Sequence, residues 1–348
     1  MDRPHLKFYA PGVPHSIDYP NTYYNGPLFD SHIHIQSIPD GGPGSENEEI
    51  DFLLLGVNTS IPHFVCTLRY DQTYRALAFF PVWEPIVDPQ LEIVSRTLEQ
   101  YPGLFVPFIM PPADDGSPNG FPTVNAAELD RMLSIRPGLF KGYGEIGLYA
   151  RNEGAPELPP NHPRLKAIYP IVRKHGLVVY FHLGEDQQEE YEEILSENPD
   201  ISFIFHGDQL ITQRQDGTQD LRAIDEILSH HPNVTYEVDE LWGDVWLLKP
   251  GAEKEDFLAH FRNYEPLLEK DLETWKALIE KHPNQVIWGS DRGVSTLWDL
   301  DHEVALQLHD YVRAFIGKLS PAVQERYAYK NSERLFGINT AQGNSTGS

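Results

Sequence analysis

The sequence contains little cysteine and no long apolar run. Cys66 is the only cysteine among 348 residues, so no intrachain disulfide can form and any metal must be bound by imidazole and carboxylate groups. No apolar run approaches the roughly 20 residues that a transmembrane helix needs, and the first residues lack the basic and apolar regions of a signal peptide. We therefore expect a cytoplasmic protein that does not engage a membrane.

Positive charge is also scarce. Only 27 Lys and Arg residues stand against 52 Asp and Glu residues, which gives a formal net charge of −25 at pH 7. A chain of this charge repels polyanions, so we expect no extended nucleic-acid surface and favour a small-molecule substrate. Solubility alone would explain the acidity equally well. The sequence leaves open whether the chain forms a homo-oligomer.

Short β-branched and aromatic runs alternate with segments of helical periodicity eight times along the chain. This alternation is typical of βα units in a parallel sheet. Eight such units predict a single α/β domain, a (β/α)8 TIM barrel with loop insertions. The predicted strands are 28–35, 63–68, 104–110, 139–146, 177–182, 201–206, 233–238 and 285–289, and the predicted helices are 126–135, 164–175, 187–197, 220–230, 272–281 and 302–316.

The chain outside these units divides into an arm, a tail and loop insertions. Residues 1–26 are predicted to form an N-terminal arm, 27–340 the barrel and 341–348 a disordered tail. Pro170 lies inside the predicted helix 164–175 and should kink or split it, because proline removes a helical hydrogen bond. The predicted insertions are 111–122, 149–163 and 239–270.

The first predicted strand carries two histidines two residues apart, His32 and His34. Because successive side chains of a strand point to opposite faces, these two imidazoles point the same way and can converge on one ligand. An H-x-H pattern alone marks surface or core histidines more often than a metal site. The interpretation therefore depends on whether other ligand-type residues reach the same place.

Further ligand-type residues follow the later apolar strands. Glu145, His182 and His206 each close a predicted strand, and Asp291 comes just after the eighth. The carboxyl ends of barrel strands form the edge where active sites are assembled, so these side chains should meet the two histidines of the first strand. The predicted metal ligands are His32, His34, Glu145, His182, His206 and Asp291.

Four other histidines provide a comparison. They lie at the ends of predicted helices, just before the next strand, which is the opposite and stabilising face of a barrel. There they suit the role of cations at helix C-termini. The placement of all six ligand-type residues at the catalytic edge is therefore hard to attribute to chance. The comparison histidines are His175, His230, His231 and His282.

These motifs resemble those of the amidohydrolase superfamily, and the resemblance spans nearly the whole chain. Residues 30–34 (Asp-Ser-His-Ile-His) are similar to its first-strand motif and 288–291 (Trp-Gly-Ser-Asp) to its eighth. Residues 144–148 (Gly-Glu-Ile-Gly-Leu) resemble the TatD-like branch, in which a glutamate replaces the carboxylated lysine that bridges two metals. Residues 182–184 and 206–208 (His-Leu-Gly and His-Gly-Asp) instead resemble the amidohydrolase-related, type 2 branch.

The resemblance implies roles for two carboxylates. Asp291 would ligate the metal and take a proton from the bound water, and Glu145 would bridge or complete a second metal position. Nitrogen and oxygen ligands suit one or two Zn²⁺ ions, with Mn²⁺, Fe²⁺ or Co²⁺ as other occupants. The alternative for Glu145 is a structural ion pair with Lys141 or Arg151.

The predicted activity is metal-dependent hydrolysis of an amide, ester, lactone or phosphoester bond in a small molecule. A decarboxylase of the same superfamily remains an alternative, as does a TatD-like nuclease, which the negative charge opposes. A metal-binding protein without turnover is disfavoured because Asp291 supplies a proton-transfer group. In the loops after the strands, Arg69 and Arg292 could bind a substrate carboxylate and Trp242 could pack against a ring.

Overall fold

The computed structural model describes most of the predicted barrel. The predicted tail 341–348 and Trp242 lie outside the described residues, and only 20–26 of the arm are described. This part of the arm packs on the last long helix, where Arg313 donates hydrogen bonds to the Tyr24 and Gly26 carbonyls. No helix among the described residues has the length and apolar character to cross a membrane. The described ranges are 20–35, 61–70, 72–149, 157–215, 217–239, 241, 253–293 and 302–338.

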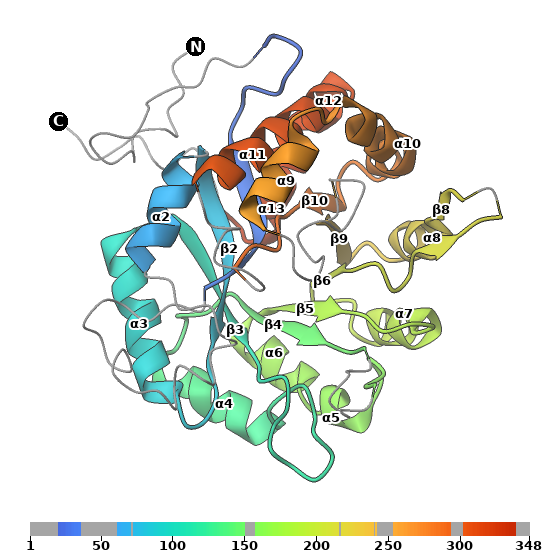
Figure 1. Cartoon of the computed structure of the whole chain (residues 1–348). Coiled ribbons are helices and arrows are strands. Elements are labelled where there is room, and N and C mark those ends of the chain that lie inside the picture. The colour runs from blue at the N-terminus through green and yellow to red at the C-terminus, as the bar shows by residue number, and fades with distance from the viewer. Residues whose placement is uncertain are drawn as a thin grey trace.

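Eight parallel strands form the sheet, and helices surround it (Figure 1). The order β1-β2-β3-β4-β5-β6-β9-β10 follows the chain, and a parallel bridge between Ile33 and Arg292 joins β1 to the segment after β10. The fold is therefore the predicted (β/α)8 TIM barrel. The strands are β1 Leu28–His34, β2 Thr73–Pro81, β3 Phe105–Met110, β4 Gly142–Gly147, β5 Val178–His182, β6 Phe203–His206, β9 Val234–Val238 and β10 Val286–Trp288, with a hairpin of β7 Thr212–Gln213 and β8 Gln219–Asp220.

Two helical segments show the boundary signals that the sequence carries. The Asn125 side chain accepts a hydrogen bond from the Glu128 backbone N–H and so caps α4, which spans the predicted range. The predicted split around Pro170 is confirmed, because α5 and α6 divide that segment. The helices are α2 Ile61–Tyr70, α3 Val87–Gln100, α4 Ala126–Ile135, α5 Pro163–Lys166, α6 Tyr169–His175, α7 Gln188–Glu197, α8 Arg222–His230, α9 Lys254–Phe261, α10 Glu265–Lys281, α11 His302–Gly317, α12 Pro321–Glu325, the π-helix η3 Arg326–Lys330 and α13 Asn331–Leu335.

The second strand lies later than the sequence predicts. The range 63–68 belongs to helix α2, and the strand is β2, which starts at Thr73. A short apolar run does not distinguish a buried helix from a strand, and Pro62 fits the first turn of a helix, where its missing N–H costs nothing. Arg69 therefore does not follow a strand. It lies at the end of α2, just before the amino end of β2, with its guanidinium 5.6 Å from the centroid of the Tyr101 ring.

Aromatic side chains fill the interior of the barrel. Phe79 meets Tyr180 edge to face with ring centroids 5.0 Å apart, and it meets Phe108 in the same way at 5.6 Å. All three are fully buried, and burial of each contributes about 1.5–3 kcal/mol. The His32 ring lies edge to face on Phe79 at 5.0 Å. The histidines at the end of β1 therefore rest on an apolar layer.

Candidate metal centre

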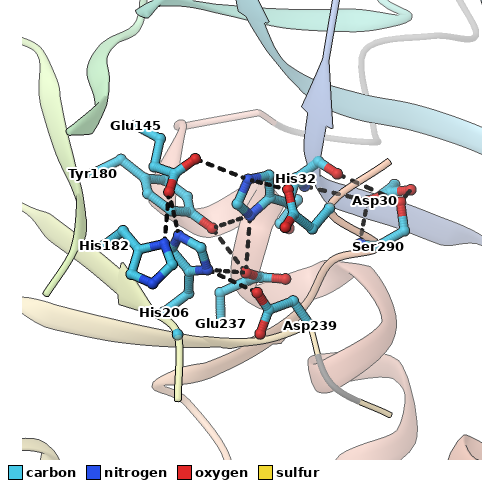
Figure 2. Close-up of polar contacts among 12 residues, drawn as sticks. Asp30, His32, Glu145, Tyr180, His182, His206, Glu237, Asp239 and Ser290 are labelled. Atoms are coloured by element: carbon cyan, nitrogen blue, oxygen red, sulfur yellow. Dashed lines mark hydrogen bonds and ion pairs between the residues drawn. The ribbon is translucent and has the colours of Figure 1, made fainter. Parts of the chain in front are cut away.

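The six predicted ligands meet at the carboxyl ends of the strands. Figure 2 shows His32, Glu145, His182 and His206 turned toward one another. His32 and the neighbouring predicted ligand His34 come from β1, and Asp291 follows β10. Glu145, His182 and His206 come from β4, β5 and β6. This is the edge at which the sequence analysis placed them.

Glu145 contacts all four histidines. Its Oε1 lies 2.9 Å from His182 Nδ1 and 2.9 Å from His206 Nε2. Its Oε2 lies 3.3 Å from His34 Nε2 and 3.5 Å from His32 Nε2. The two oxygens of one carboxylate therefore divide the histidines into two pairs.

Asp291 contacts the two histidines of β1. Its Oδ1 lies 3.1 Å from His32 Nε2 and 3.2 Å from His34 Nε2. Its side chain is 27% exposed, so it faces solvent more than the buried histidines do. The backbone φ of Asp291 is 48°, a left-handed conformation that is uncommon for residues other than glycine. This conformation must be held by neighbouring contacts.

Asp30 supplies those contacts. Its carboxylate accepts hydrogen bonds from the Ser290 N–H at 3.0 Å and the Ser290 hydroxyl at 2.6 Å, and from the His32 N–H at 3.2 Å. An Arg292 guanidinium nitrogen lies 3.4 Å from the same carboxylate. Asp30 thereby ties the residues on both sides of Asp291 to strand β1. Asp30 was not predicted from the sequence to be a site residue.

Two carboxylates behind the histidines were also missed. Glu237 Oε2 lies 3.2 Å from His32 Nδ1, and Asp239 Oδ2 lies 2.7 Å from His206 Nδ1. The Tyr180 hydroxyl donates a hydrogen bond to Glu237 Oε2 at 2.9 Å. A signal was present in the sequence, because two acidic residues in alternation at the end of an apolar strand repeat the spacing of the H-x-H pattern.

The other two histidines have outer contacts as well. His182 Nε2 lies 2.6 Å from Gln209 Oε1, and His34 Nδ1 lies 3.2 Å from the Met110 sulfur. Each of the four imidazoles thus has one ring nitrogen toward an outer acceptor and the other toward Glu145. Metal-binding histidines usually show this arrangement, because the outer contact fixes the ring and its tautomer.

The electrostatics of the cluster couple its acids to its histidines. Burial disfavours the charged form of Glu145, but His206 and His182 outweigh it and hold the pKa of Glu145 well below its usual range. Burial also disfavours protonation of His206, yet Glu145 and Asp239 raise its pKa to about 10. Burial, followed by the charge of Asp239, raises the pKa of Glu237 to about 7. Positive charge on the histidines thus offsets buried negative charge.

The residues fit a divalent cation. Four carboxylates meet four histidines in a largely buried cluster, and bound cations would supply the positive charge that protonated histidines otherwise provide. The donors are nitrogen and oxygen, which suit Zn²⁺, Mn²⁺, Fe²⁺ or Co²⁺. Among the residues that the structure describes, three overlapping groups have ligand atoms within 4.8 Å of one another: His32, His34 and Glu145; Glu145, His182 and His206; and His32, His206, Glu237 and Asp239.

The structure does not bring the two predicted substrate arginines together. Arg69 lies at the end of α2, near the amino end of β2 and so away from the carboxyl ends that hold the cluster. Arg292 is 1% exposed, with guanidinium contacts to Asp30 and His309. Lys141 is exposed just before β4, and the partners of Glu145 described above are histidines. The structural pairing of Glu145 with Lys141 is therefore not observed, and Arg151 lies outside the described residues.

Three solved structures share the fold over nearly the whole chain. A probable 2-pyrone-4,6-dicarboxylic acid hydrolase from Acinetobacter baumannii with citric acid bound is 12% identical, with coverage of 89% of this chain and 99% of that chain and a TM-score of 0.53. An amidohydrolase from Burkholderia multivorans with bound zinc is 13% identical (90% and 100%, TM-score 0.52). A dihydroxybenzoic acid decarboxylase from Polaromonas sp. JS666 with manganese and the inhibitor 2-nitroresorcinol is 9% identical (89% and 97%, TM-score 0.50).

A family match covers most of the barrel. Residues 88–338 match the model of the Amidohydrolase family (Amidohydro_2), a range that begins in α3, after the H-x-H pattern of β1. This match gives no support to the TatD-like resemblance of residues 144–148. No curated protein matches the chain. The chain belongs to the Amidohydrolase family and is an enzyme of the amidohydrolase superfamily.

Proposed function

We propose that this enzyme is a metal-dependent hydrolase that uses water to cleave an amide, ester, lactone or phosphoester bond in a small molecule. The observation that carries the proposal is the contact of the two Glu145 oxygens with two separate pairs of histidines. Each pair, with its shared carboxylate, offers nitrogen and oxygen donors for one ion, and Zn²⁺ is the first choice. Such an ion, when bound, polarises a substrate oxygen and lowers the pKa of a bound water toward 7.

Residues of this chain would then perform binding and proton transfer. His32, His34 and Asp291 would form one metal position, and His182 and His206 the other, with Glu145 shared. Asp291 would accept the proton of the attacking water at its carboxylate and pass it to the leaving group. Its 27% exposure leaves it accessible from the solvent side of the cluster.

Decarboxylation of a carboxylic acid is the second candidate function. The Polaromonas decarboxylase, which shares the fold, supports it, and the same first metal position could serve either reaction. Two adjacent metal positions are typical of metallohydrolases, so the arrangement around Glu145 favours hydrolysis. The formal net charge of −25 opposes a polyanionic nucleic-acid substrate.

A product assay separates the two reactions. Protein stripped of metal and reconstituted with Zn²⁺ or Mn²⁺ would be screened against esters, lactones, phosphoesters and aromatic carboxylic acids. We expect hydrolysis products without CO₂, and loss of this activity by roughly 10²–10⁴-fold in Asp291→Asn with metal still bound. Asp225→Asn, in helix α8 and outside the cluster, is the control and should keep its activity. Release of CO₂ alone would favour the decarboxylase, and activity that is indifferent to metal removal would contradict both.

A further inference from the structure

Strand β9 places two carboxylates behind the histidines. Glu237 is 0% exposed in the strand, and Asp239 follows two residues later, also buried. The two side chains therefore point to the same side, into the barrel. Figure 2 shows Glu237 beside His32 and Asp239 beside His206, on the far side of both rings from Glu145. The contacts join Glu237 Oε2 to His32 Nδ1 at 3.2 Å and Asp239 Oδ2 to His206 Nδ1 at 2.7 Å.

The outer contact decides which ring nitrogen can bind a metal. A neutral imidazole carries one N–H, and only its other nitrogen has a lone pair for a ligand bond. When Nδ1–H of His32 or His206 is donated to a carboxylate, Nε2 is left facing Glu145. His32 Nε2 lies near Glu145 Oε2, and His206 Nε2 lies near Oε1. Glu237 Oε2 also lies 3.9 Å from His206 Nδ1, which is beyond hydrogen-bond distance. The hydrogen-bonded histidines of Glu237 and Asp239 therefore belong to different proposed metal positions.

Glu237 is held in place by its surroundings. The Tyr180 hydroxyl donates to its Oε2 at 2.9 Å. Gly289 leaves the space for Oε1, because a Cβ at that position would stand 1.9 Å from it. Among the described residues Oε1 has no hydrogen-bond partner. A buried carboxylate with one unpaired oxygen is costly to the fold, which argues for a role in the site rather than in stability.

We propose that Glu237 and Asp239 are positioning residues, each holding one histidine for one of two metal positions. Glu237 orients His32 for the position that includes Asp291, and Asp239 orients His206 for the other position. The remaining two histidines contact an amide oxygen and a thioether sulfur, which are weaker acceptors than a carboxylate. Each proposed metal position therefore includes one histidine whose outer ring nitrogen contacts a carboxylate. This inference rests on the proposed metal-dependent function.

The test measures metal affinity rather than turnover. Zn²⁺ would be titrated against a competing chelator with the wild type, Glu237→Gln and Asp239→Asn. Loss of such an outer carboxylate typically lowers metal affinity by about 10–100-fold, and we expect that loss at one position in each variant. In a His182→Asn background, which removes the second position, Glu237→Gln should still lower the remaining affinity and Asp239→Asn should leave it unchanged.

Asp225→Asn is the matched control. Asp225 Oδ1 contacts His282 Nε2 at 2.7 Å, a carboxylate–histidine pair outside the cluster, so this variant should bind Zn²⁺ like the wild type. Glu237→Asp, which keeps the charge but draws it away from His32, replaces Glu237→Gln if that variant fails to fold.

The outcomes separate the two proposals. A wild type that binds no Zn²⁺ or Mn²⁺ would contradict the proposed function itself. If the wild type binds metal, and Glu237→Gln and Asp239→Asn bind Zn²⁺ with the same affinity as the wild type, the positioning inference is overturned. The proposed function then still stands. Equal losses at both positions from either variant would also overturn it, because each carboxylate would then lack a position of its own.

Discussion

Replacing Gly289 with alanine should push Glu237 away from His32. The new Cβ would stand 1.9 Å from Glu237 Oε1 and 2.7 Å from His32 Cβ. Non-bonded carbon and oxygen atoms need about 3 Å or more, so the carboxylate must move by at least about 1 Å. Glu237 is fully buried and tied to Tyr180, and overpacking of this kind costs about 1–3 kcal/mol of unfolding free energy.

The assay combines urea denaturation with Zn²⁺ titration. We expect Gly289→Ala to lose about 1–3 kcal/mol and to bind more weakly at the His32 position, by about tenfold. The double variant Gly289→Ala/Glu237→Asp should recover part of the stability, because a shorter acid avoids the new Cβ while the overlap with His32 Cβ remains. If Gly289→Ala matches the wild type in stability and affinity, the packing argument is refuted.

Three further predictions concern contacts at and away from the cluster. Asp30→Ala should cost roughly 3 kcal/mol or more in urea denaturation, since each buried donor left unsatisfied costs about 1–3 kcal/mol; a loss below about 1 kcal/mol would count against this. Burial alone would raise the pKa of Asp225, but Lys281 and His282 outweigh burial and lower this pKa below its usual value. The contacts of the Asp225 carboxylate therefore stabilise the fold above the unfolded pKa of about 3.9. This stabilisation is lost as the pH falls through the lower pKa of the folded state. The stability gap between wild type and Asp225→Asn should thus be largest near pH 7, at most about 1 kcal/mol for so exposed a pair, and vanish in acid; a gap that persists there would contradict it. Tyr180→Phe should lose about 1 kcal/mol in urea denaturation with the donor to Glu237, and an unchanged unfolding midpoint would show that this hydrogen bond contributes nothing.

Much of the barrel could be predicted from the sequence because its strands are apolar runs that end in polar residues. The range 233–238 contains β9, and 126–135 matches α4, whose Asn125 cap marks its start. The second unit was misread because 63–68 is aromatic and β-branched yet helical. Only its packing against the barrel decides between helix and strand, and that information is not local.

The meeting of the six predicted metal ligands could be predicted because each lies in the carboxyl-terminal part of a strand or just after it, a feature that the sequence displays directly. The alternation of Glu237 and Asp239 at a strand end is also visible in the sequence, but the histidine that each of them contacts could not be predicted. Glu237 acts on His32, which is 205 residues away in the chain, and the contact depends on which strands face each other across the barrel. The same holds for Arg292, whose place beside Asp30 joins residues 262 apart. The position of Arg292 in a loop after a strand suggested a contact with substrate, but the side chain is buried in the folded chain.

The central claim is a metal centre organised around Glu145, and the most direct test is the metal content of the protein. Wild type and Glu145→Gln would be reconstituted with Zn²⁺, freed of excess metal and measured by elemental analysis. The account predicts one or two ions per chain in the wild type and fewer in Glu145→Gln, because both pairs of histidines lose their shared carboxylate. A wild type without bound metal, or a Glu145→Gln variant with the same content as the wild type, would contradict it.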